Sequence, residues 1–348
     1  MARKPFRIEV NYPTKGTKKC FLVRDIQVNK KRRKVRISIG STPPDNAQEM
    51  EKLRRSHGLE MSLKVAKAKA RLSQSQYHSK FLSNEQMQNL EWIRWLYQGL
   101  VELMTTNEVE LYERMFEVSY IQGTTSIEGN TMTLGEARDL LEYNLSPKNK
   151  TLREINEVQN FRQVVKFRNQ YRGNVSLDFI RILHTLIMNN IDTESAGTFR
   201  RVNNVGIHDR DLILTPAMMI ESELQEAIDT YYSGLDAGVH PFELAFLFHH
   251  RFESIHPFND GNGRVGREIL NLMLRRGKYP RLLFLGKDRR RYLDALRAGD
   301  EDRFGDMLST FASLISDQRL SVLEGNMRSM FASRRRIQAR LEDWVQSS

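Results

Sequence analysis

The sequence predicts a mainly α-helical protein that begins with a small antiparallel β-sheet. Two observations predict this fold class. Over residues 6–40, apolar residues alternate with polar or basic ones, which is the period of a strand with one buried face. From residue 84 onward, apolar residues recur three and four positions apart, which is the period of a helix with one buried face. We therefore expect a helical bundle preceded by a β-rich accessory domain.

Composition narrows the class of protein further. The chain has 348 residues, of which 40% are hydrophobic, and this suits about two domains with packed cores. It contains no run of about 18 apolar residues, so we expect no membrane span. The N-terminus lacks the apolar segment of a signal peptide, and the single cysteine, Cys20, cannot form an internal disulfide. We expect a cytoplasmic protein.

The positive charge is concentrated in the N-terminal quarter. The formal net charge is +11, yet residues 1–90 alone carry 21 Lys and Arg against 7 Asp and Glu. Lys30 to Lys34 are five consecutive basic residues at a predicted hairpin turn. Such a run can bind nucleic-acid phosphates, but no aromatic residue is interleaved for base stacking, so a solvated hairpin tip is the favoured interpretation. A protein-docking role for this sheet is equally open.

Breaks in the pattern divide the chain into four segments. The run Ser41-Thr42-Pro43-Pro44 ends the β pattern, and a charged, partly amphipathic stretch follows it. The predicted segments are a basic β-rich accessory domain at 1–45, a helical connector at 46–104, a helical central domain at 105–310 and a C-terminal helical extension at 311–348.

The most informative stretch is the run at 256–267, His-Pro-Phe-Asn-Asp-Gly-Asn-Gly-Arg-Val-Gly-Arg. The apolar residues before it have helical spacing, and Pro257 ends that helix because proline lacks an N–H group. A second apolar helical pattern begins at about Arg264. The run is therefore predicted to form a polar loop between two buried helices.

This loop contains the residue types of a phosphate-binding site. Gly261 and Gly263, with Asn262 between them, permit positive φ and close approach of the backbone, so that N–H groups can converge on an anion. The helix that follows offers unpaired N–H groups and the positive end of its dipole. Arg264 and Arg267 are three positions apart, so both can lie on one face and bind phosphate oxygens.

Two further residues of the loop supply a metal ligand and a base. Asp260 offers a carboxylate oxygen, which is the ligand that Mg²⁺ takes when it also binds substrate phosphates. His256 is of the type that changes charge near neutral pH and commonly acts as a general base. Together with the glycine loop and the two arginines, these residues indicate transfer chemistry on a nucleotide.

The run at 256–267 resembles the signature of the Fic (filamentation induced by cAMP) family, His-Pro-Phe-x-Asp/Glu-Gly-Asn-Gly-Arg-x-x-Arg, and matches every defined position. The resemblance implies a Fic-type helical bundle with a β-hairpin flap. It also implies transfer of AMP from ATP to a Ser, Thr or Tyr hydroxyl of a target protein, including the protein itself. His256 would be the catalytic base and Asp260 the Mg²⁺ ligand, while 261–264 and Arg267 would bind the nucleotide.

A second stretch, at 124–130, resembles the inhibitory motif of the same family, Ser/Thr-x-x-x-Glu-Gly/Asn. By itself it indicates a helix end, because Gly129 favours the left-handed conformation. Glu128 is then unfavourably placed, since its carboxylate meets the negative end of the helix dipole. The resemblance implies an inhibitory helix at about 115–130 whose Glu128 points into the nucleotide site. There Glu128 would compete with the γ-phosphate of ATP for Arg267, which slows transfer more than it weakens binding.

The flap is expected between the two motifs. Strand-like residues at 202–214 flank a polar turn, and this hairpin resembles the Fic flap that aligns a target segment by strand addition. We assign target contact to Val205, Gly206 and Ile207.

Other histidines are expected to be structural. His184 lies on an apolar helical face and is predicted to be a packed residue. A metal cluster of His249, His250 and His256 is not expected, because adjacent histidines on a helix point in different directions.

Several alternatives stay open at this stage. The same loop could transfer phosphate or UMP, or Glu128 could position a water that removes AMP, which would make the protein bifunctional. A nucleic-acid-binding regulator built on residues 1–90 is the non-enzymatic alternative. The sequence does not indicate the oligomeric state, and a dimer is open.

Overall fold

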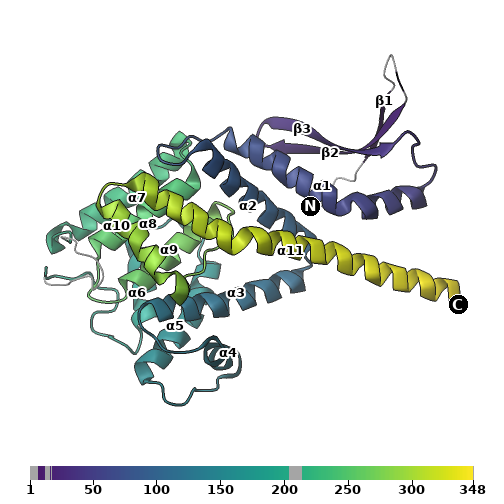
Figure 1. Ribbon diagram of the computed structural model, residues 1–348. Coiled ribbons are helices and arrows are strands. Elements are labelled where there is room, and N and C mark those ends of the chain that lie inside the picture. Colours follow the sequence, from purple (N-terminus) through teal and green to yellow (C-terminus); the bar gives the residue numbers. More distant parts are fainter. Residues whose placement is uncertain (1–6, 12–15, 17, 204–213, 348) are drawn as a thin grey trace. The chain divides into compact units, whose positions relative to one another are not determined.

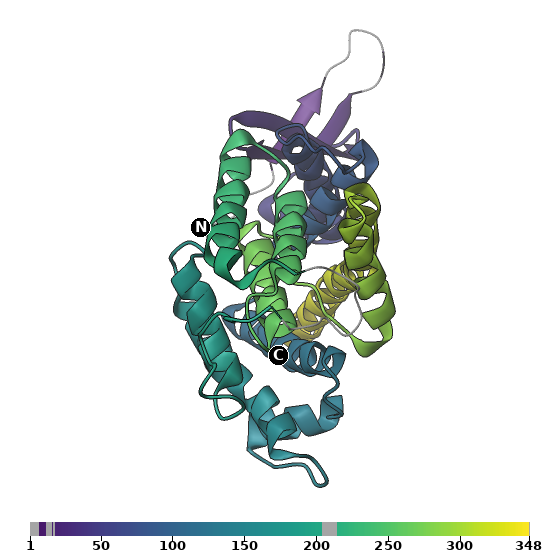
Figure 2. The same ribbon diagram turned by 90° about the vertical axis from the view of Figure 1, so that its left-hand side faces the viewer.

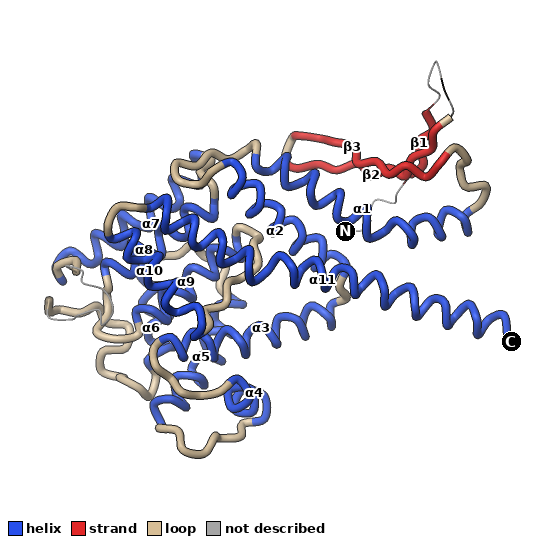
Figure 3. The backbone as a smooth tube through the Cα atoms, viewed as in Figure 1, coloured by secondary structure: helices blue, strands red, loops and turns tan. Residues whose placement is uncertain are grey.

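The described strands all lie within the first forty residues, and helices form most of the remaining chain (Figure 3). The computed structural model describes residues 7–11, 16, 18–203 and 214–347, with side chains as far as residue 333. The mainly α fold with a small N-terminal antiparallel sheet is confirmed. Within the described ranges, no helix is both long and apolar enough to cross a membrane.

The described elements follow one another in a simple order. They are β1 (Arg7–Asn11), β2 (Lys19–Val28), β3 (Lys31–Gly40), α1 (Ala47–Gln74), α2 (Asn84–Leu103), α3 (Thr106–Ile127), α4 (Leu134–Tyr143), α5 (Leu152–Gln170), α6 (Leu177–Met188), η1 (Ala217–Met219), α7 (Ile220–Ala237), α8 (Pro241–Ile255), α9 (Asn262–Arg276), η2 (Gly286–Asp288), α10 (Arg289–Asp300) and α11 (Phe304–Ser347).

The chain forms two compact units. Unit 1 consists of residues 1–77, 87–104 and 319–348, and unit 2 consists of residues 78–86 and 105–318. Both sequence motifs lie in unit 2. The four segments predicted from the sequence stay a prediction.

The sheet of unit 1 is an antiparallel meander with the strand order β1-β2-β3 (Figure 1). Its second turn is made by Asn29 and Lys30, and Asn29 adopts the left-handed φ of 52° that asparagine tolerates. Because side chains alternate between the faces of a strand, one face of the sheet is apolar and packs on α1. The core of this unit contains Leu22, Ile26, Val35, Ile37, Met61 and Val65.

Unit 2 is organised around α8 and α9, which bury most of their residues. These two helices pack against each other; α7 and α10 contact α8, while α3 and α6 contact α9. Figure 2 shows α7 and α8 side by side. The loop at 256–261 joins the two central helices, so the predicted catalytic loop starts and ends on well-packed elements.

Three helices of unit 2 begin with a capping box. In α3, α4 and α5 a threonine accepts a hydrogen bond from the third helical N–H group, and a glutamate at that position bonds back to the threonine. The threonine that caps α4 is Thr133. At α5, hydrogen bonds from Thr131 and Thr151 lower the pKa of Glu154 to about 2. The starting points of these helices are therefore fixed locally.

Buried ion pairs connect α3 to α5 and α9. Arg168 on α5 is 1% exposed; its Nη1 bonds to Glu268 of α9 at 2.9 Å, and its Nη2 bonds to Glu117 of α3. Arg281 bonds to Glu117 and to Glu113 of α3, each at 2.5 Å. Removing one member of such a network would leave a buried charge unpaired, which costs about 3–5 kcal/mol. The network fixes α3 beside α9.

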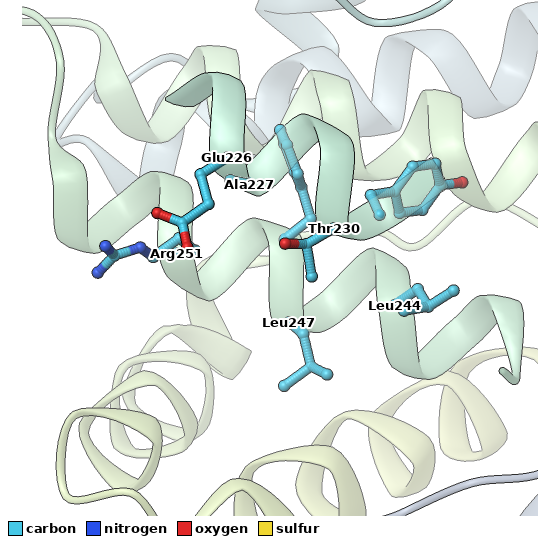
Figure 4. A pocket seen from close by; sticks show the side chains of 8 residues that line it. Glu226, Ala227, Thr230, Leu244, Leu247 and Arg251 are labelled. Atoms are coloured by element: carbon cyan, nitrogen blue, oxygen red, sulfur yellow. The ribbon is translucent and has the colours of Figure 1, made fainter. Parts of the chain in front are cut away.

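Two pockets of unit 2 lie away from both motifs. One, of about 310 Å³, lies between α7 and α8 and is lined by residues that include Glu226, Thr230, Leu247 and Arg251 (Figure 4). The other, of about 830 Å³, is a groove beside α3, α4 and α5. None of the predicted site residues lines either pocket.

We predict that Gly123→Ala lowers the melting temperature of the protein. A Cβ at this position of α3 would overlap the backbone carbonyl oxygen of Phe284, which has little freedom to move. Overpacking of this kind costs about 1–3 kcal/mol, or roughly 2–10 °C in Tm for a chain of this size. The matched control is Gly135→Ala on α4, where a Cβ would meet no atom within 4 Å. Thermal unfolding followed by circular dichroism would contradict this packing if both variants lost stability equally.

Candidate active site

His256 lies just outside α8, as predicted. The helix ends at Ile255, and His256 is its C-cap residue with the left-handed angles φ 49° and ψ 63°. Its N–H group bonds to the carbonyl oxygen of Phe252 at 3.0 Å. A left-handed histidine is uncommon and needs support from its surroundings.

Arg200 provides that support. Its side chain is 3% exposed, and its Nε donates to the carbonyl oxygen of His256 at 2.8 Å. Its two other nitrogens donate to the carbonyl oxygens of Val202, Thr215 and Ile255. A single guanidinium therefore satisfies four carbonyl groups around the end of α8 and fixes the backbone that carries His256.

The loop after His256 is closed by a reciprocal pair of hydrogen bonds. The side chain of Asn262 accepts from the N–H of Phe258 and donates to its carbonyl oxygen, each at 2.8 Å. Asn262 is 2% exposed, so its amide is committed to the loop and only its backbone is available for an anion. Phe258 is also buried, and its ring stacks on His184 with ring centroids 3.7 Å apart.

His184 is a buried structural residue, as predicted. Burial lowers its pKa to about 4, so the ring is neutral at neutral pH. Its Nδ1 accepts from the N–H of Gly197 at 2.8 Å, which places the proton on Nε2. Nε2 then donates to the carbonyl oxygen of Asp260 at 3.0 Å. This histidine therefore fixes the position of the loop through the carbonyl oxygen of Asp260 and the ring of Phe258.

The two glycines of the loop serve different purposes, which corrects our expectation that both use positive φ. Gly261 has a φ of 78° and caps α9, so the helix begins at Asn262, two residues earlier than predicted. Gly263 is already helical. A side chain there would overlap the carboxylate of Glu128 and come within 2.7 Å of Arg267 Nη1, so the glycine makes room for this pair.

Asp260 and Arg264 form an ion pair at the start of α9. Arg264 Nη2 lies 3.0 Å from Asp260 Oδ1, and its Nη1 lies 3.2 Å from Glu157 of α5. Arg153 bonds to the other oxygen of Asp260. Burial opposes ionisation of Asp260, but Arg264, the N–H of Gly261 and Arg153 outweigh it and hold the pKa below its ordinary value. Asp260 is therefore a carboxylate at neutral pH, and 41% of its side chain is exposed.

Arg267 bonds to the end of α3. The side chain is 1% exposed; its Nε donates to Thr124 Oγ1 at 2.8 Å, and its Nη2 donates to the Thr124 carbonyl oxygen at 2.9 Å. The same Nη2 lies 2.7 Å from Glu128 Oε1. Burial opposes the charge on Arg267, but the carboxylate of Glu128 outweighs it, and the pKa of Arg267 is raised above its ordinary value. The structure thus brings the two sequence motifs together.

Glu128 caps the C-terminal end of α3, which spans 106–127 and so includes most of the inhibitory helix expected at 115–130. Gly129 follows with a φ of 98° and turns the chain away, as its sequence position predicted. The Glu128 carboxylate lies against Gly263, in the first turn of α9, where helical N–H groups have no intrahelical acceptors. The position is therefore an anion site formed by a helix N-terminus and a buried arginine.

Other predicted residues lie apart from this site or outside the described part of the chain. His249 bonds to Tyr292 and His250 bonds to Asp300, each at 2.9 Å, so the adjacent histidines have different partners. Among the described residues, no group of three or more metal-ligating side chains is found. Val205, Gly206 and Ile207, the flap residues, lie outside the described residues.

The site predicted from the sequence did not include Arg200, Glu157, Arg153 and Asn130. Asn130 is 6% exposed and bonds to Glu157, so Glu157 joins the loop after α3 to Arg264. Arg200 follows the run Gly-Thr-Phe, where the helical pattern ends. A charged residue so close to apolar ones was the available sequence signal that its side chain is buried and has a structural role. No sequence signal distinguished Glu157 from its exposed neighbours on α5.

Comparison with known proteins places this geometry in a family. The Fic/DOC family matches residues 174–274, which include the whole loop at 256–267. Protein adenylyltransferase fic-1 from Caenorhabditis elegans is 30% identical over 187 residues, which cover 52% of this chain and 36% of that protein. Protein adenylyltransferase Fic from Aedes aegypti is 30% identical over 212 residues, which cover 59% of this chain and 40% of that protein. The chain thus spans well under half the length of these curated relatives.

Solved structures share the fold. A fragment of Fic-1 from Caenorhabditis elegans superposes with a TM-score of 0.61 at 22% identity, covering 84% of this chain and 89% of that one. A Fic domain containing signaling protein from Bacteroides thetaiotaomicron gives a TM-score of 0.60 at 23% identity, covering 70% of this chain and 96% of that one. The match at residues 174–274 shows that this chain contains a Fic/DOC domain, which includes the complete signature loop, and the solved Fic structures share its fold.

Proposed function

We propose that this chain is a protein adenylyltransferase whose activity is restrained by Glu128. One observation carries the proposal: the Glu128 carboxylate lies against the first turn of α9 and 2.7 Å from Nη2 of the buried Arg267. A helix N-terminus and a buried arginine are the features that bind a phosphate group. The carboxylate thus stands where a nucleotide phosphate is expected.

The type of reaction is supported by the relatives. Both curated proteins compared above are named protein adenylyltransferases, and they match 52% and 59% of this chain. AMP transfer from ATP to a protein hydroxyl is therefore the activity we assign. The target is a second protein or another copy of this one. We assign contact with it to the flap residues Val205, Gly206 and Ile207.

In the proposed reaction, the hydroxyl oxygen of a target Ser, Thr or Tyr attacks the α-phosphorus of ATP. His256 accepts the hydroxyl proton as the new oxygen–phosphorus bond forms, the bond to the bridging oxygen breaks and pyrophosphate leaves. Hydrogen bonds to Phe252 and Arg200 fix the backbone of His256 on both sides. The fixed backbone gives the side chain of His256 a defined starting position, which favours an oriented attack.

The phosphates of ATP are assigned to the start of α9. The N–H groups of Asn262, Gly263 and Arg264 lie in its first turn, and such groups attract negative charge. The guanidinium of Arg264 adds a second cation to that of Arg267, and both are almost completely buried. Low exposure strengthens the attraction between an arginine and a phosphate because water screens it less.

Asp260 fits the Mg²⁺ that this reaction implies. It is an ionised, partly exposed carboxylate beside the proposed phosphate site, and Mg²⁺ bound through substrate phosphates needs only one or two protein carboxylates. When bound, the metal would neutralise charge on the phosphates. Arg153 and Arg264 share the oxygens of Asp260 and keep the carboxylate in a fixed orientation.

Restraint by Glu128 acts on the placement of the triphosphate. The position beside Nη2 of Arg267 can hold one outer phosphate of ATP. The carboxylate of Glu128 occupies this position through a charge-assisted hydrogen bond. ATP can still bind through its remaining groups, but its α-phosphorus then lies away from the line of attack. Glu128 therefore lowers the rate of transfer more than the affinity for ATP.

We predict that Glu128→Gly raises the rate of AMP transfer by about tenfold to a hundredfold, the equivalent of one hydrogen bond to a charged group. Glu128→Gln is the matched control, because it keeps the shape of the side chain and removes its charge. It should give an intermediate rate. The measurement is incorporation of label from α-labelled ATP into protein with Mg²⁺ present.

Labels at other positions distinguish this reaction from its alternatives. Label transferred from γ-labelled ATP, or from α-labelled UTP but not ATP, would replace adenylyl transfer by phosphate or UMP transfer. An unchanged rate in Glu128→Gly would contradict the restraint while leaving the chemistry intact.

We further predict that His256→Ala, made in the Glu128→Gly protein, reduces AMP transfer by about 10²–10⁴-fold, the usual contribution of a general base. The dissociation constant for ATP, measured by isothermal titration calorimetry, should change by less than about threefold, because no phosphate contact is assigned to His256. The loss of binding free energy should therefore be smaller than the roughly 1.4 kcal/mol that corresponds to a tenfold change. Undiminished transfer would exclude His256 as the base, and loss of both transfer and binding would indicate a disrupted loop.

A further inference from the structure

The hairpin of β2 and β3 in unit 1 presents a basic surface that the proposed transfer reaction does not use. Both strands have ten residues, so the ribbon is roughly 34 Å long. β3 is an edge strand of the sheet. The turn at residues 29 and 30 begins the run Lys30–Lys34, and each of these five side chains is exposed.

The pairing register separates the two faces of this ribbon. Leu22 pairs with Ile37 and Ile26 pairs with Arg33; the three apolar residues belong to the core on α1. The pairs that alternate with these point to the opposite face. That face, which we call the outer face, contains the pairs Val23–Arg36, Asp25–Lys34 and Gln27–Arg32. In Figure 1 the sheet lies on α1, with its other face turned away from that helix.

Two carboxylates arrange the cations in the middle of the outer face. Glu9 of β1 forms ion pairs with Lys34 at 3.3 Å and with Arg36 at 3.1 Å. Asp25 pairs with Arg7 at 2.9 Å. Arginine and lysine still outnumber the carboxylates, and their side chains remain between 42% and 47% exposed.

The tip of the ribbon carries cations with no such neutralisation. Among the side chains that the structure describes, none of the four cations Lys30 to Arg33 has a carboxylate within ion-pair distance. Lys31 bonds to the hydroxyl of Ser75 at 2.9 Å, and Arg32 bonds to the side chain of Gln27. A dense group of cations without neighbouring carboxylates destabilises the folded chain through mutual repulsion, unless water or a polyanion surrounds it.

The tip is held in place by the end of α1. The side chain of Asn29 bonds to that of Gln76, and Gln76 in turn bonds to the carbonyl oxygen of Val28 at 3.3 Å. Together with the bond from Lys31 to Ser75, these contacts join the turn to the residues that follow the last helical turn. The cations are therefore displayed on an ordered scaffold.

We propose that the β2–β3 ribbon binds double-stranded DNA, with its tip on the phosphates and its outer face toward a groove. The major groove of B-form DNA is about 12 Å wide and admits a two-stranded β-ribbon. Gln27 and Arg32, side by side on the outer face, are residue types that bond to adenine and guanine edges there. Lys30 at the turn supplies contacts to the phosphates, and so does Arg33, which is exposed on the edge strand β3 although it belongs to the other face of the ribbon and flanks the groove.

Two features favour duplex DNA over other nucleic acids. No aromatic residue lies between Asp25 and Arg36, so the ribbon lacks the stacking surface that single strands require. The major groove of duplex RNA is too deep and narrow for such a ribbon. The missing aromatics, which favoured a solvated tip at the level of sequence, exclude single-strand stacking but leave duplex binding unaffected.

Fluorescence anisotropy with the full chain and a labelled DNA duplex of about 20 base pairs tests this proposal. If about five phosphates are contacted, a rise from about 50 to 200 mM salt should lower the association constant by roughly several hundred-fold. The variant Lys30→Gln/Arg33→Gln should bind at least about tenfold more weakly and reduce the salt slope by about two. Neither side chain has a partner in the described structure, so the variant should fold normally.

Two comparisons make the result specific to the ribbon. Lys148→Gln/Lys287→Gln removes the same charge from exposed positions of unit 2 and should leave binding and salt slope unchanged. Gln27→Ala/Arg32→Ala should keep most of the salt slope and reduce discrimination between duplexes of different sequence. Circular dichroism of each variant confirms that the sheet is intact.

Other outcomes would overturn the proposal. These are the absence of duplex binding at about 50 mM salt, equal binding by the ribbon variant and wild type, or tighter binding of single-stranded DNA or duplex RNA. Binding to phosphatidylserine vesicles or to an acidic peptide, lost in the ribbon variant while DNA does not bind, would replace DNA by a membrane or a protein. AMP transfer by the same variants measures the function proposed for unit 2 independently.

Discussion

The site depends on one buried cation. Arg267 is held in the interior of unit 2, and a guanidinium in that position requires acceptors for its N–H groups and an anion for its charge. Thr124 supplies two acceptors through its hydroxyl and its carbonyl oxygen, and Glu128 supplies the anion. Any other ligand of Arg267 must provide the same negative charge. This requirement is the physical basis of the competition that we propose between the carboxylate on α3 and a nucleotide phosphate.

The surrounding fold keeps that place available to either anion. Gly263 leaves room beside α9 for a carboxylate, and the ion pairs of Arg168 and Arg281 hold α3 at the correct distance. His184 and Arg200 fix the two ends of the loop between α8 and α9. Most of these supporting side chains are buried and fix the backbone, so the loop and Glu128 are both positioned before any ligand binds.

Much of this arrangement could be predicted from the sequence, for physical reasons. The helical bundle and the small sheet follow from two hydrophobic periods, and the pairing of Arg267 with Glu128 follows from two short motifs that the family resemblance connects. The start of α9 was predicted two residues late, because a left-handed Gly261 caps the helix and lets Asn262 begin it. Glu157 could not be found, and the signal for Arg200 was weak, since each acts through partners far away in the chain. The role of Gly263 also depends on a neighbour 135 residues earlier, which no local pattern reveals.

The most direct test of the central claim is a crystal structure of the Glu128→Gly protein with ATP and Mg²⁺. If the carboxylate and the γ-phosphate compete for one anion position, a γ-phosphate oxygen will be bonded to Arg267 Nη2 beside Gly263, where Oε1 of Glu128 lies in the present structure. A triphosphate bound elsewhere, with Arg267 still bonded to Thr124 and without a phosphate, would contradict the account.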